Sequence, residues 1–367
     1  MTLEKTDVAI IGSGIVGSSA AYFLSESGAK VTIIDPNPHT DNASVSAAGI
    51  INPIDHKYMT KDSWPFTQAA YEIHKYLWPI LQSNPAFPTK TLLKLSFNHA
   101  ETEINRIYLE SSRKTPGIST KWLSTEQAIA LEPRMPHNIH GALMINGVGV
   151  VNSSQYTQSW TNAANKYGAK TKKSNATGLQ ECRKQITGVR LGSQVLPCKS
   201  VILTMGPWTS TASSWIQTDI PISPLKGEII HVTAPNPPLT YVVEHNEYMA
   251  IPKHDGNVWM ASTVESSGFN KSITDTARVH LSRIYRKMFP NITQCNVVSQ
   301  TACLRPIAPD NFPIIGRVPD WKGLYIATGA GKKGILLGPA MGRAISDMIT
   351  QGYTSLPIDR FSFTRFT

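Results

Sequence analysis

Cysteine is scarce in this sequence, which holds four among 367 residues. No two of them form a C-x-x-C pair, and they do not cluster along the chain. This spacing excludes a disulfide-rich scaffold and a typical zinc site. We therefore expect neither a bound metal ion nor a disulfide framework.

Long apolar runs are missing as well. Although 41% of the residues are hydrophobic, no apolar run approaches the eighteen or so residues that a membrane-spanning helix requires. The first predicted strand begins at Asp7, which leaves no room for a signal peptide before it. These features predict a soluble, cytoplasmic globular protein, and its length suits two domains.

Concentrated charge is the third absence. Lys and Arg total 35 against 25 Asp and Glu, a net charge of +10. The basic residues are scattered in ones and twos, as at Lys172-Lys173 and Arg286-Lys287. Without a basic run or a basic helix with interleaved aromatics, nucleic-acid binding is not indicated. The charge instead favours a solvated basic surface that attracts anionic ligands.

What the sequence does contain is a nucleotide-binding fingerprint at its start. The apolar run 7–11 is followed at 12–17 by GSGIVG, which is G-x-G-x-x-G at a predicted strand-to-helix junction. In this motif Gly12 permits the tight turn, Gly14 lets the backbone approach a pyrophosphate, and Gly17 lets the helix pack close to the strand. The motif in this context predicts a bound dinucleotide.

The segment after the glycines supports the same prediction. A helix is expected from Ile15 to Ser27, and its N-terminal N–H groups would face the phosphates. A second apolar run, 31–34, ends in Asp35, whose carboxylate can accept hydrogen bonds from ribose hydroxyls and would repel a 2′-phosphate. The glycine pattern alone does not choose between a nicotinamide and a flavin dinucleotide.

Helical and strand patterns alternate along the rest of the chain. Apolar periodicity predicts helices at 67–78, 101–111, 124–130, 154–167, 273–289 and from about 339 to 350, and strands at 141–151, 199–204, 228–233, 247–252, 257–263 and 323–328. We expect an α/β fold in which a Rossmann-type dinucleotide-binding domain interleaves with an α+β substrate domain built on an antiparallel sheet. The predicted segments are 1–55, 140–215 and 300–367 for the first domain, and 56–139 and 216–299 for the second.

A second glycine-rich loop near the C-terminus favours a flavin. The sequence GAGKKG occupies 329–334, between a predicted strand and the last helix. Such a loop brings N–H groups and the positive end of a helix to one place. A reduced flavin develops negative charge at its N1 and C2 carbonyl edge, whereas a nicotinamide does not.

Together, five stretches make the chain resemble the D-amino-acid-oxidase-like superfamily of FAD-dependent oxidoreductases, most closely bacterial glycine oxidases and D-amino-acid dehydrogenases. The stretches are the N-terminal fingerprint, SAAG at 46–49, LTMGPW at 203–208, LRP at 304–306 with the following PD at 309–310, and the segment from TG at 328 to GP at 339. They occur in family order over nearly the whole chain.

The resemblance implies an extended FAD, with its ADP on the N-terminal unit and its isoalloxazine between 47–51 and 329–336. The residues implied to bind it are Gly12, Gly14, Ile15, Val16, Gly17, Asp35, Ser46, Ala47, Ala48, Gly49, Ile51, Thr204, Gly206, Trp208, Arg305, Gly329, Gly331, Lys332, Lys333, Gly334 and Ile335.

The resemblance also implies three catalytic residues. Arg305 matches the family arginine that grips the substrate carboxylate, and a planar guanidinium suits that task because it binds a carboxylate in bidentate fashion. Tyr248 matches a tyrosine whose hydroxyl holds the same carboxylate, although ordinary packing on the sheet is the alternative. Lys332 stands where glycine oxidases carry an arginine, and it would supply a positive charge near substrate or flavin.

Two positions depart from the glycine oxidase pattern. Ala330 and Lys332 replace a histidine and an arginine of those enzymes, which leaves the identity of the substrate open. Cys303 stands where sarcosine oxidases carry the cysteine bonded to the flavin 8-methyl group. The neighbouring Leu304-Arg305-Pro306 follows the non-covalent relatives, which favours a small buried thiol at Cys303.

The predicted activity is FAD-dependent oxidation of an amine alpha to a carboxylate, with glycine, a D-amino acid or an N-alkyl glycine as substrate. Hydride would pass from the alpha carbon to flavin N5, the imine would hydrolyse to a 2-oxo acid, and oxygen or another acceptor would take the electrons. Two alternatives stay open: a nicotinamide-dependent dehydrogenase, and a flavoprotein subunit that acts only through a partner. Homo-oligomer formation also stays open.

Overall fold

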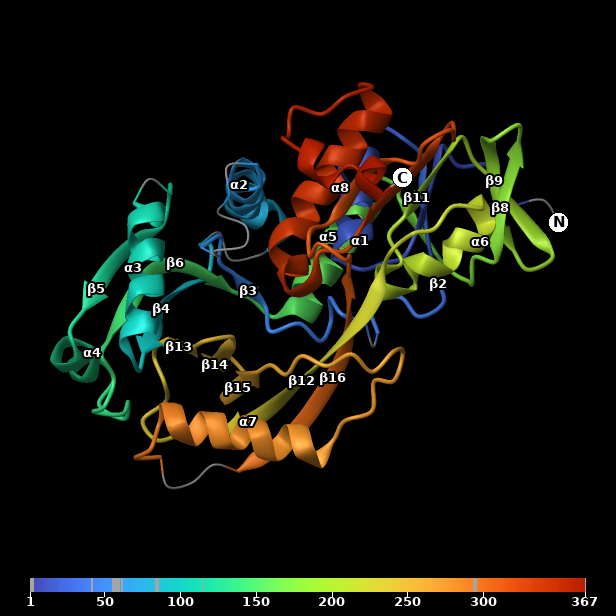
Figure 1. Cartoon of the computed structure of the whole chain (residues 1–367). Coiled ribbons are helices and arrows are strands. Elements are labelled where there is room, and N and C mark those ends of the chain that lie inside the picture. The colour runs from blue at the N-terminus through green and yellow to red at the C-terminus, as the bar shows by residue number, and fades with distance from the viewer. Residues whose placement is uncertain are drawn as a thin grey trace.

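The computed structural model of the chain describes residues 3–40, 42–54, 60, 62–82, 86–113, 115–292 and 296–366. Within them, the strands form two large sheets and one small sheet. Figure 1 shows the large sheets in different halves of the molecule, one among helices α1, α5 and α8 and the other above helix α7. The α/β fold class with a separate, largely antiparallel sheet is confirmed.

The first large sheet is the predicted dinucleotide-binding sheet. Its strand order is β17-β18-β11-β1-β2-β7, parallel except for β17, which pairs antiparallel with β18. All four residues of β1 are buried, as expected for a parallel strand covered on both faces. The strands are β1 (Val8–Ile11), β2 (Val31–Asp35), β7 (Lys170–Lys173), β11 (Ser200–Leu203), β17 (Ile314–Arg317) and β18 (Leu324–Thr328).

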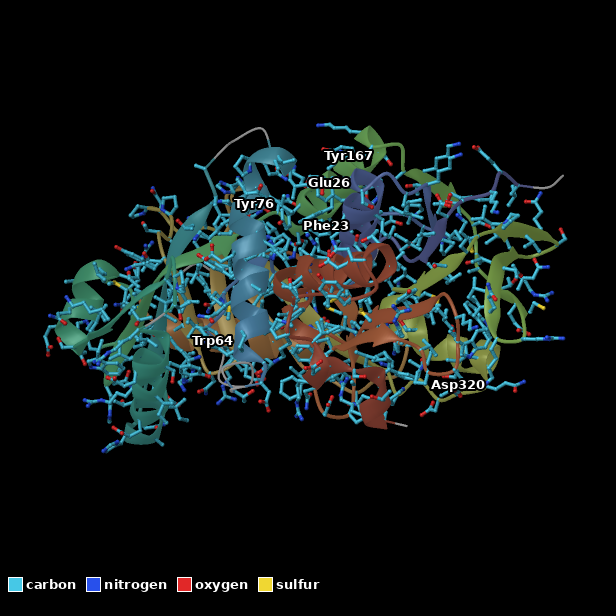
Figure 2. All side chains as sticks on the ribbon, turned by 90° about the horizontal axis from the view of Figure 1, so that it is seen from above. Phe23, Glu26, Trp64, Tyr76, Tyr167 and Asp320 are labelled. Atoms are coloured by element: carbon cyan, nitrogen blue, oxygen red, sulfur yellow. The ribbon has the colours of Figure 1, made fainter. Side chains whose placement is uncertain are left out.

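Helices cover one face of this sheet and the small sheet covers the other, as alternate residues of β1 show. Val8 and Ile10 pack in the core shared with α1 (Ile15–Glu26), α2 (Trp64–Leu81), α5 (Ser153–Lys166) and α8 (Gly334–Thr350). Ala9 and Ile11 pack on the opposite face against the small sheet of β8 (Gly178–Cys182), β9 (Gln185–Leu191) and β10 (Gln194–Pro197). Figure 2 shows this helical layer from above, with Trp64 and Tyr76 on α2 and Phe23 on α1.

The second large sheet has the order β16-β12-β15-β14-β13-β4-β6-β3, with β5 paired to β6. Every pairing in it is antiparallel except β13 with β4. Its far face packs on α7 (Asp275–Met288), while its near face joins the core of the helical layer. The strands are β3 (Ile50–Ile51), β4 (Thr89–Ser96), β5 (Ser119–Leu123), β6 (Gly141–Val150), β12 (Ser223–Thr233), β13 (Val242–His245), β14 (Tyr248–Pro252), β15 (Asn257–Ala261) and β16 (Val297–Ile307).

Three strands of this second sheet come wholly or mostly from segments that were predicted for the first domain. β3, β6 and most of β16 come from the segments 1–55, 140–215 and 300–367, yet they pair within the sheet of the substrate domain. Figure 1 shows β12 and β16 running together from that sheet toward the other half of the molecule. The two halves therefore share continuous strands as well as a surface.

Most predicted helices are confirmed, with one difference at the last. The Ser124 cap before α4 (Thr125–Leu131) forms a full capping box with Gln127, and α3 (His99–Ser112) begins at a capping Asn98. Helix α8, however, begins at Gly334, five residues before the predicted Pro339. Pro339 lies in the second turn of the helix, where its missing N–H removes one backbone hydrogen bond.

None of the helices among the described residues is long and apolar enough to cross a membrane.

Candidate active site

A cavity of about 1280 Å³ runs between the two large sheets. Its lining begins at the fingerprint residues Gly12 and Gly14 and at Asp35, and it ends at Arg305 on the second sheet. This volume exceeds the roughly 300–1,000 Å³ of most small-ligand sites. The cavity thus has room for an elongated ligand together with a smaller second one.

The end of the cavity at the first sheet is built by the fingerprint. Gly12 has a φ of +109°, and a Cβ on it would lie 2.4 Å from the Thr204 carbonyl oxygen, so only glycine fits this turn. A Cβ on Gly17 would lie 2.0 Å from the Gly12 carbonyl oxygen, which confirms the close packing of helix on strand. The Asp35 carboxylate accepts hydrogen bonds from Ser13 N and Ser13 Oγ at 2.8 and 2.9 Å.

The middle of the cavity is enclosed by segment 44–50 on one side and the glycine-rich loop before α8 on the other. Ser44 Oγ accepts a hydrogen bond from Ile15 N at 2.9 Å, which joins this segment to the start of α1. From the second sheet, Lys253 Nζ donates to the carbonyl oxygens of Ala48 and Val151. Burial lowers the pKa of Lys253 to about 8, so the side chain is mostly charged at neutral pH.

Arg305 stands on β16 at the opposite end, and its residue is only 8% exposed. Its guanidinium donates to the Ser262 hydroxyl at 2.7 Å and to the Thr263 carbonyl at 3.2 Å. Within the described part of the chain the guanidinium has these two hydrogen-bond partners, which leaves further donors of its five for a ligand in the cavity that Arg305 lines. Burial lowers the pKa of Arg305, but an arginine stays protonated nonetheless. A buried cation of this kind suits an anionic ligand.

Gly227 on β12 makes room for that guanidinium. A Cβ on Gly227 would lie 1.7 Å from Arg305 Nη2. Gly227 is the register partner of Cys303 on the neighbouring strand, so the arginine side chain folds back across the glycine. A side chain at 227 would have to push the guanidinium away.

Residues 7–348 match the family described as FAD dependent oxidoreductase, DAO. This match extends over both large sheets. The chain belongs to the DAO family.

Known members resemble this DAO family chain over nearly its whole length. It is 25% identical to the glycine oxidase of Geobacillus kaustophilus (strain HTA426), with 99% of this chain and 97% of that protein covered. The crystal structure of glycine oxidase from Bacillus cereus ATCC 14579 superposes with a TM-score of 0.88 at 25% identity, over 97% of this chain and 98% of that one. The structure of iminodiacetate oxidase from Chelativorans sp. BNC1 gives a TM-score of 0.85 at 25% identity, over 97% and 98%.

The residues of this DAO family member fit the cofactor of the family. Gly12 and Gly14 of the fingerprint turn have no side chain to obstruct a pyrophosphate, and they line the same cavity as Asp35. The predicted cofactor residues that the cavity brings together are Gly12, Gly14, Ile15, Val16, Asp35, Ser46, Ala47, Ala48, Gly49, Thr204, Gly206, Trp208, Arg305, Gly329, Gly331, Lys332, Lys333, Gly334 and Ile335. Gly17 lies behind this lining and acts through packing.

Ile51 is a correction to the predicted cofactor residues. It is fully buried in the core of the helical layer, whereas Ile50 lines the cavity. Both belong to β3, in which neighbouring side chains point to opposite faces. Ile51 therefore lies on the face of β3 that points away from the cavity.

Tyr248 is the second correction. Its hydroxyl is 2.9 Å from His280 Nε2 of α7, and its ring packs with the core on the far face of the second sheet. The cavity is lined instead by the flanking Glu247 and Met249, because side chains alternate along β14. Met249 occupies the position that we predicted for a carboxylate-binding hydroxyl.

Lys332 reaches the rim of the cavity but has an acidic partner there. Its Nζ lies 2.7 Å from Glu247 Oε2, and Glu247 is also close enough to raise the pKa of Arg305 slightly against the effect of burial. Cys303 lines the cavity two residues from Arg305, and burial raises the pKa of its thiol. A neutral thiol is a weak nucleophile.

A buried ion pair in the cavity wall was not predicted from the sequence. Lys94 Nζ contacts Glu244 Oε1, with the side chains only 14% and 10% exposed, and both residues line the cavity. A signal for them existed, since each is a single charge within an otherwise apolar strand segment, LLKL on β4 and VVEH on β13. Buried charges in such positions are often functional.

Proposed function

We propose that this protein is an FAD-dependent oxidoreductase that oxidises the amine alpha to a carboxylate in a small amino acid or related compound. The observation that carries the proposal is the buried guanidinium of Arg305, held at one end of a cavity whose other end is a dinucleotide fingerprint. The names of the relatives, glycine oxidase and iminodiacetate oxidase, support an amino acid or imino acid as substrate.

The fingerprint residues Gly12 and Gly14 would hold the pyrophosphate of FAD, and Asp35 would accept hydrogen bonds from its adenosine ribose. Segment 46–50 and the loop 329–335 would enclose the ring system. When bound, FAD supplies the acceptor of the substrate's hydride. The fingerprint leaves the choice of dinucleotide open, and the family match supports FAD over a nicotinamide.

Arg305 binds the substrate carboxylate and fixes the direction of the alpha carbon. Ser262 and Thr263 hold the guanidinium from one side, so its remaining donors face the ligand. The apolar Met249 and Ala261 line the cavity beside it and exclude water. After the amine has lost a hydride and a proton, the imine is hydrolysed by water to a 2-oxo acid and ammonia or an amine.

Lys332 contributes charge at the rim rather than a direct grip on the carboxylate, since it is paired with Glu247. We also propose that the cofactor is not covalently bound. Cys303 is buried with a raised pKa, which disfavours the thiolate that bond formation requires. Acid precipitation would then release the flavin into the supernatant.

The test is anaerobic reduction of the purified yellow protein by a panel of small amino and imino acids, followed by stopped-flow absorbance. At least one compound is expected to bleach the flavin band in the wild type. Arg305→Lys keeps the charge but loses the fork, so reduction should slow and the apparent affinity for substrate should fall while flavin content persists. Arg305→Ala should reduce both further.

Arg278→Lys is the matched control, because Arg278 lies on α7 in an exposed pair with Asp275. It is expected to behave as wild type. A protein without yellow colour would favour a nicotinamide enzyme, and a yellow protein that no amine bleaches would favour a partner-dependent subunit. Wild-type reduction in both Arg305 variants would contradict its assignment.

A further inference from the structure

The chain that follows β15 stays paired with β12 through a β-bulge. The last pair of the regular ladder is Ile229 with Ala261, and beyond the end of β15 Lys226 pairs with Glu265. Between these two pairs β12 has two residues, whereas the other segment has three, 262–264. One extra residue on one side makes a β-bulge, which bends the chain and redirects its side chains. We call 262–264 the bulge.

The bulge supplies the acceptors that hold the Arg305 guanidinium. Ser262 Oγ accepts a hydrogen bond from it at 2.7 Å, and the Thr263 carbonyl accepts another at 3.2 Å. Gly227, on the strand opposite the bulge, leaves the space that the guanidinium occupies. The direction of the guanidinium, and with it that of a bound carboxylate, therefore depends on the conformation of the bulge.

A buried lysine closes the bulge on the side away from the ladder. Lys226 Nζ lies 3.0 Å from Glu228 Oε1 and 3.3 Å from Glu265 Oε2, and Lys226 is only 1% exposed. The backbone N–H of Lys226 donates to the Glu265 carbonyl at 2.9 Å, and the Glu265 N–H donates to the Lys226 carbonyl at 3.0 Å. Lys226 thus ties the residue directly after the bulge to β12 through both main chain and side chain.

Glu228 in turn fixes Lys226. Its fully buried carboxylate accepts hydrogen bonds from Thr274 N and Thr274 Oγ1, both at 2.9 Å, and from Gln300 Nε2 at 2.6 Å. Its main chain also reaches the bulge, since Glu228 N donates to Thr263 Oγ1 at 2.9 Å and Thr263 N donates to the Glu228 carbonyl at 3.1 Å. The carboxylate cannot move without breaking several of these bonds, so the Lys226 ammonium beside it is held in place.

Stability alone is a poor reason for this ion pair, because apolar residues of similar volume often stabilise a fold as well as a buried ion pair does. Neither Lys226 nor Glu228 lines the cavity, so neither touches a ligand there. We propose that Lys226 is a positioning residue for Arg305: held by Glu228, it closes the bulge at Glu265 and thereby fixes the acceptors of the guanidinium. This inference rests on the proposed function, since it assigns the support of the arginine that binds the substrate carboxylate.

The test measures binding of carboxylates that lack an amine and therefore bind without turnover. Holoprotein is titrated with acetate, propionate and butyrate, and binding is followed by the visible spectrum of the flavin and by the shift in unfolding temperature. Lys226→Met keeps the length of the side chain and removes its charge. The Kd of the tightest of the three carboxylates is expected to rise about tenfold, while flavin content stays at the wild-type level.

A double-mutant cycle separates positioning from a general effect on the fold. Lys226→Met is combined with Arg305→Lys, whose ammonium lacks the planar fork that the bulge directs, and in that background it should change the Kd by less than about twofold. Glu265→Leu opens the bulge from its half-exposed side and leaves the buried pair intact, so a rise of about threefold is expected. The matched control Lys170→Met removes an exposed ion pair on β7 and should bind as wild type.

The outcomes separate this inference from the proposed function. If Arg305→Lys weakens carboxylate binding but Lys226→Met does not, or if Lys226→Met weakens it equally in both backgrounds, the inference is wrong and the proposed function stands. Should Lys226→Met fail to fold, Glu265→Leu decides through the same cycle, and wild-type binding in that variant contradicts the inference. If no carboxylate and no amino acid binds through Arg305, both proposals fall together.

Discussion

The position of the Arg305 side chain is determined by residues of neighbouring strands rather than by its own strand. Its guanidinium is held by Ser262 and Thr263 from the end of β15, and it crosses β12 at Gly227. The lack of a side chain at 227 is what allows this path. The arginine and the glycine are therefore one unit, although they lie 78 positions apart in the sequence.

Gly227→Ala should impair substrate binding without removing the cofactor. The added methyl would lie 1.7 Å from Arg305 Nη2, so the guanidinium has to move, and a misplaced carboxylate anchor weakens binding and slows reduction. We expect at least a tenfold rise in the KM of the best substrate, about 1.4 kcal/mol in binding free energy. Stopped-flow reduction and flavin absorbance measure the two effects.

The matched control is Gly178→Ala on β8, where the nearest atom to an added Cβ is Arg190 Cδ at 3.5 Å. This is ordinary contact distance, and none of the β8 residues lines the cavity. If both glycine variants keep wild-type kinetics, Gly227 does not position Arg305. If Gly227→Ala loses its flavin, the glycine serves the fold.

Residues that belong to a motif could be predicted from the sequence. Residues whose position depends on which face of a strand they occupy could not. The cavity brings together Gly12, Gly14, Asp35 and Arg305. These residues could be predicted because a glycine motif and a guanidinium suited to a carboxylate are recognisable in the sequence alone. Tyr248 was wrong, because its position on β14 is one residue out of phase with the cavity. The face of the sheet to which a strand residue points is fixed by the register with neighbouring strands. That register cannot be read from the sequence.

Helix α8 joins the cofactor loop to the core, and His74 of α2 supports its first turns. His74 Nε2 donates to the Leu336 carbonyl at 2.9 Å, while Nδ1 accepts from the Tyr156 hydroxyl at 2.7 Å. Pro339 has no N–H for the carbonyl four residues earlier, and the imidazole lies beside that part of the helix. These two bonds require the neutral ring.

The pH dependence of stability should report on this histidine. Complete burial lowers the pKa of His74 to about 4 from an ordinary 6.5. The unfolded chain therefore takes up the proton below pH 6.5 and the folded chain does not, so this contribution is complete above pH 6.5 and is lost as the pH falls toward 4. The loss amounts to about 3 kcal/mol, from 1.36 kcal/mol for each pKa unit.

His74→Gln should lower stability at pH 7 and also flatten the pH dependence between 6.5 and 4. Urea unfolding at several pH values measures both. Burial also lowers the pKa of His39, His231 and His245, so the variant is needed to isolate one ring. The exposed His137→Gln is the control, and an unaltered slope in His74→Gln would refute this assignment.

Helices and strands were the most predictable features of the structure. The capped α4, the amphipathic α7 and the Asp255-Gly256 turn all follow from local chemistry. The start of α8 could not be predicted in this way, because a proline usually marks the first turn of a helix. Here Pro339 lies inside the helix, one turn after the Leu336 carbonyl that binds His74.

The two halves of the molecule are joined by shared strands and by Lys253. Strands β12 and β16, each eleven residues long, pair at ten positions. Strands β3 and β6 bring chain from the first half into the second sheet. Lys253 adds a cation that crosses between them, donating to the Ala48 and Val151 carbonyls and lying 4.8 Å from the Trp259 ring. This arrangement keeps segment 44–50 at a fixed distance from the second sheet.

Lys253→Met should therefore weaken both the fold and the cofactor site. It keeps the length of the side chain but leaves two carbonyl groups without their charged donor, which costs about 1.5–3 kcal/mol of stability. FAD is expected to dissociate more readily, because segment 44–50 loses its anchor. Titration of apoprotein with FAD and urea unfolding of the holoprotein measure these effects, with the exposed Lys121→Met on β5 as control.

The order of the first sheet has a consequence for how the protein is made. Strand β1 is synthesised about 190 residues before its partner β11 and more than 310 residues before β18. At about 5–20 residues per second, the ribosome leaves β1 and β2 without their neighbours for many seconds. The first sheet is thus completed only after β18 has emerged, and until then its apolar strands expose edges that are prone to aggregation.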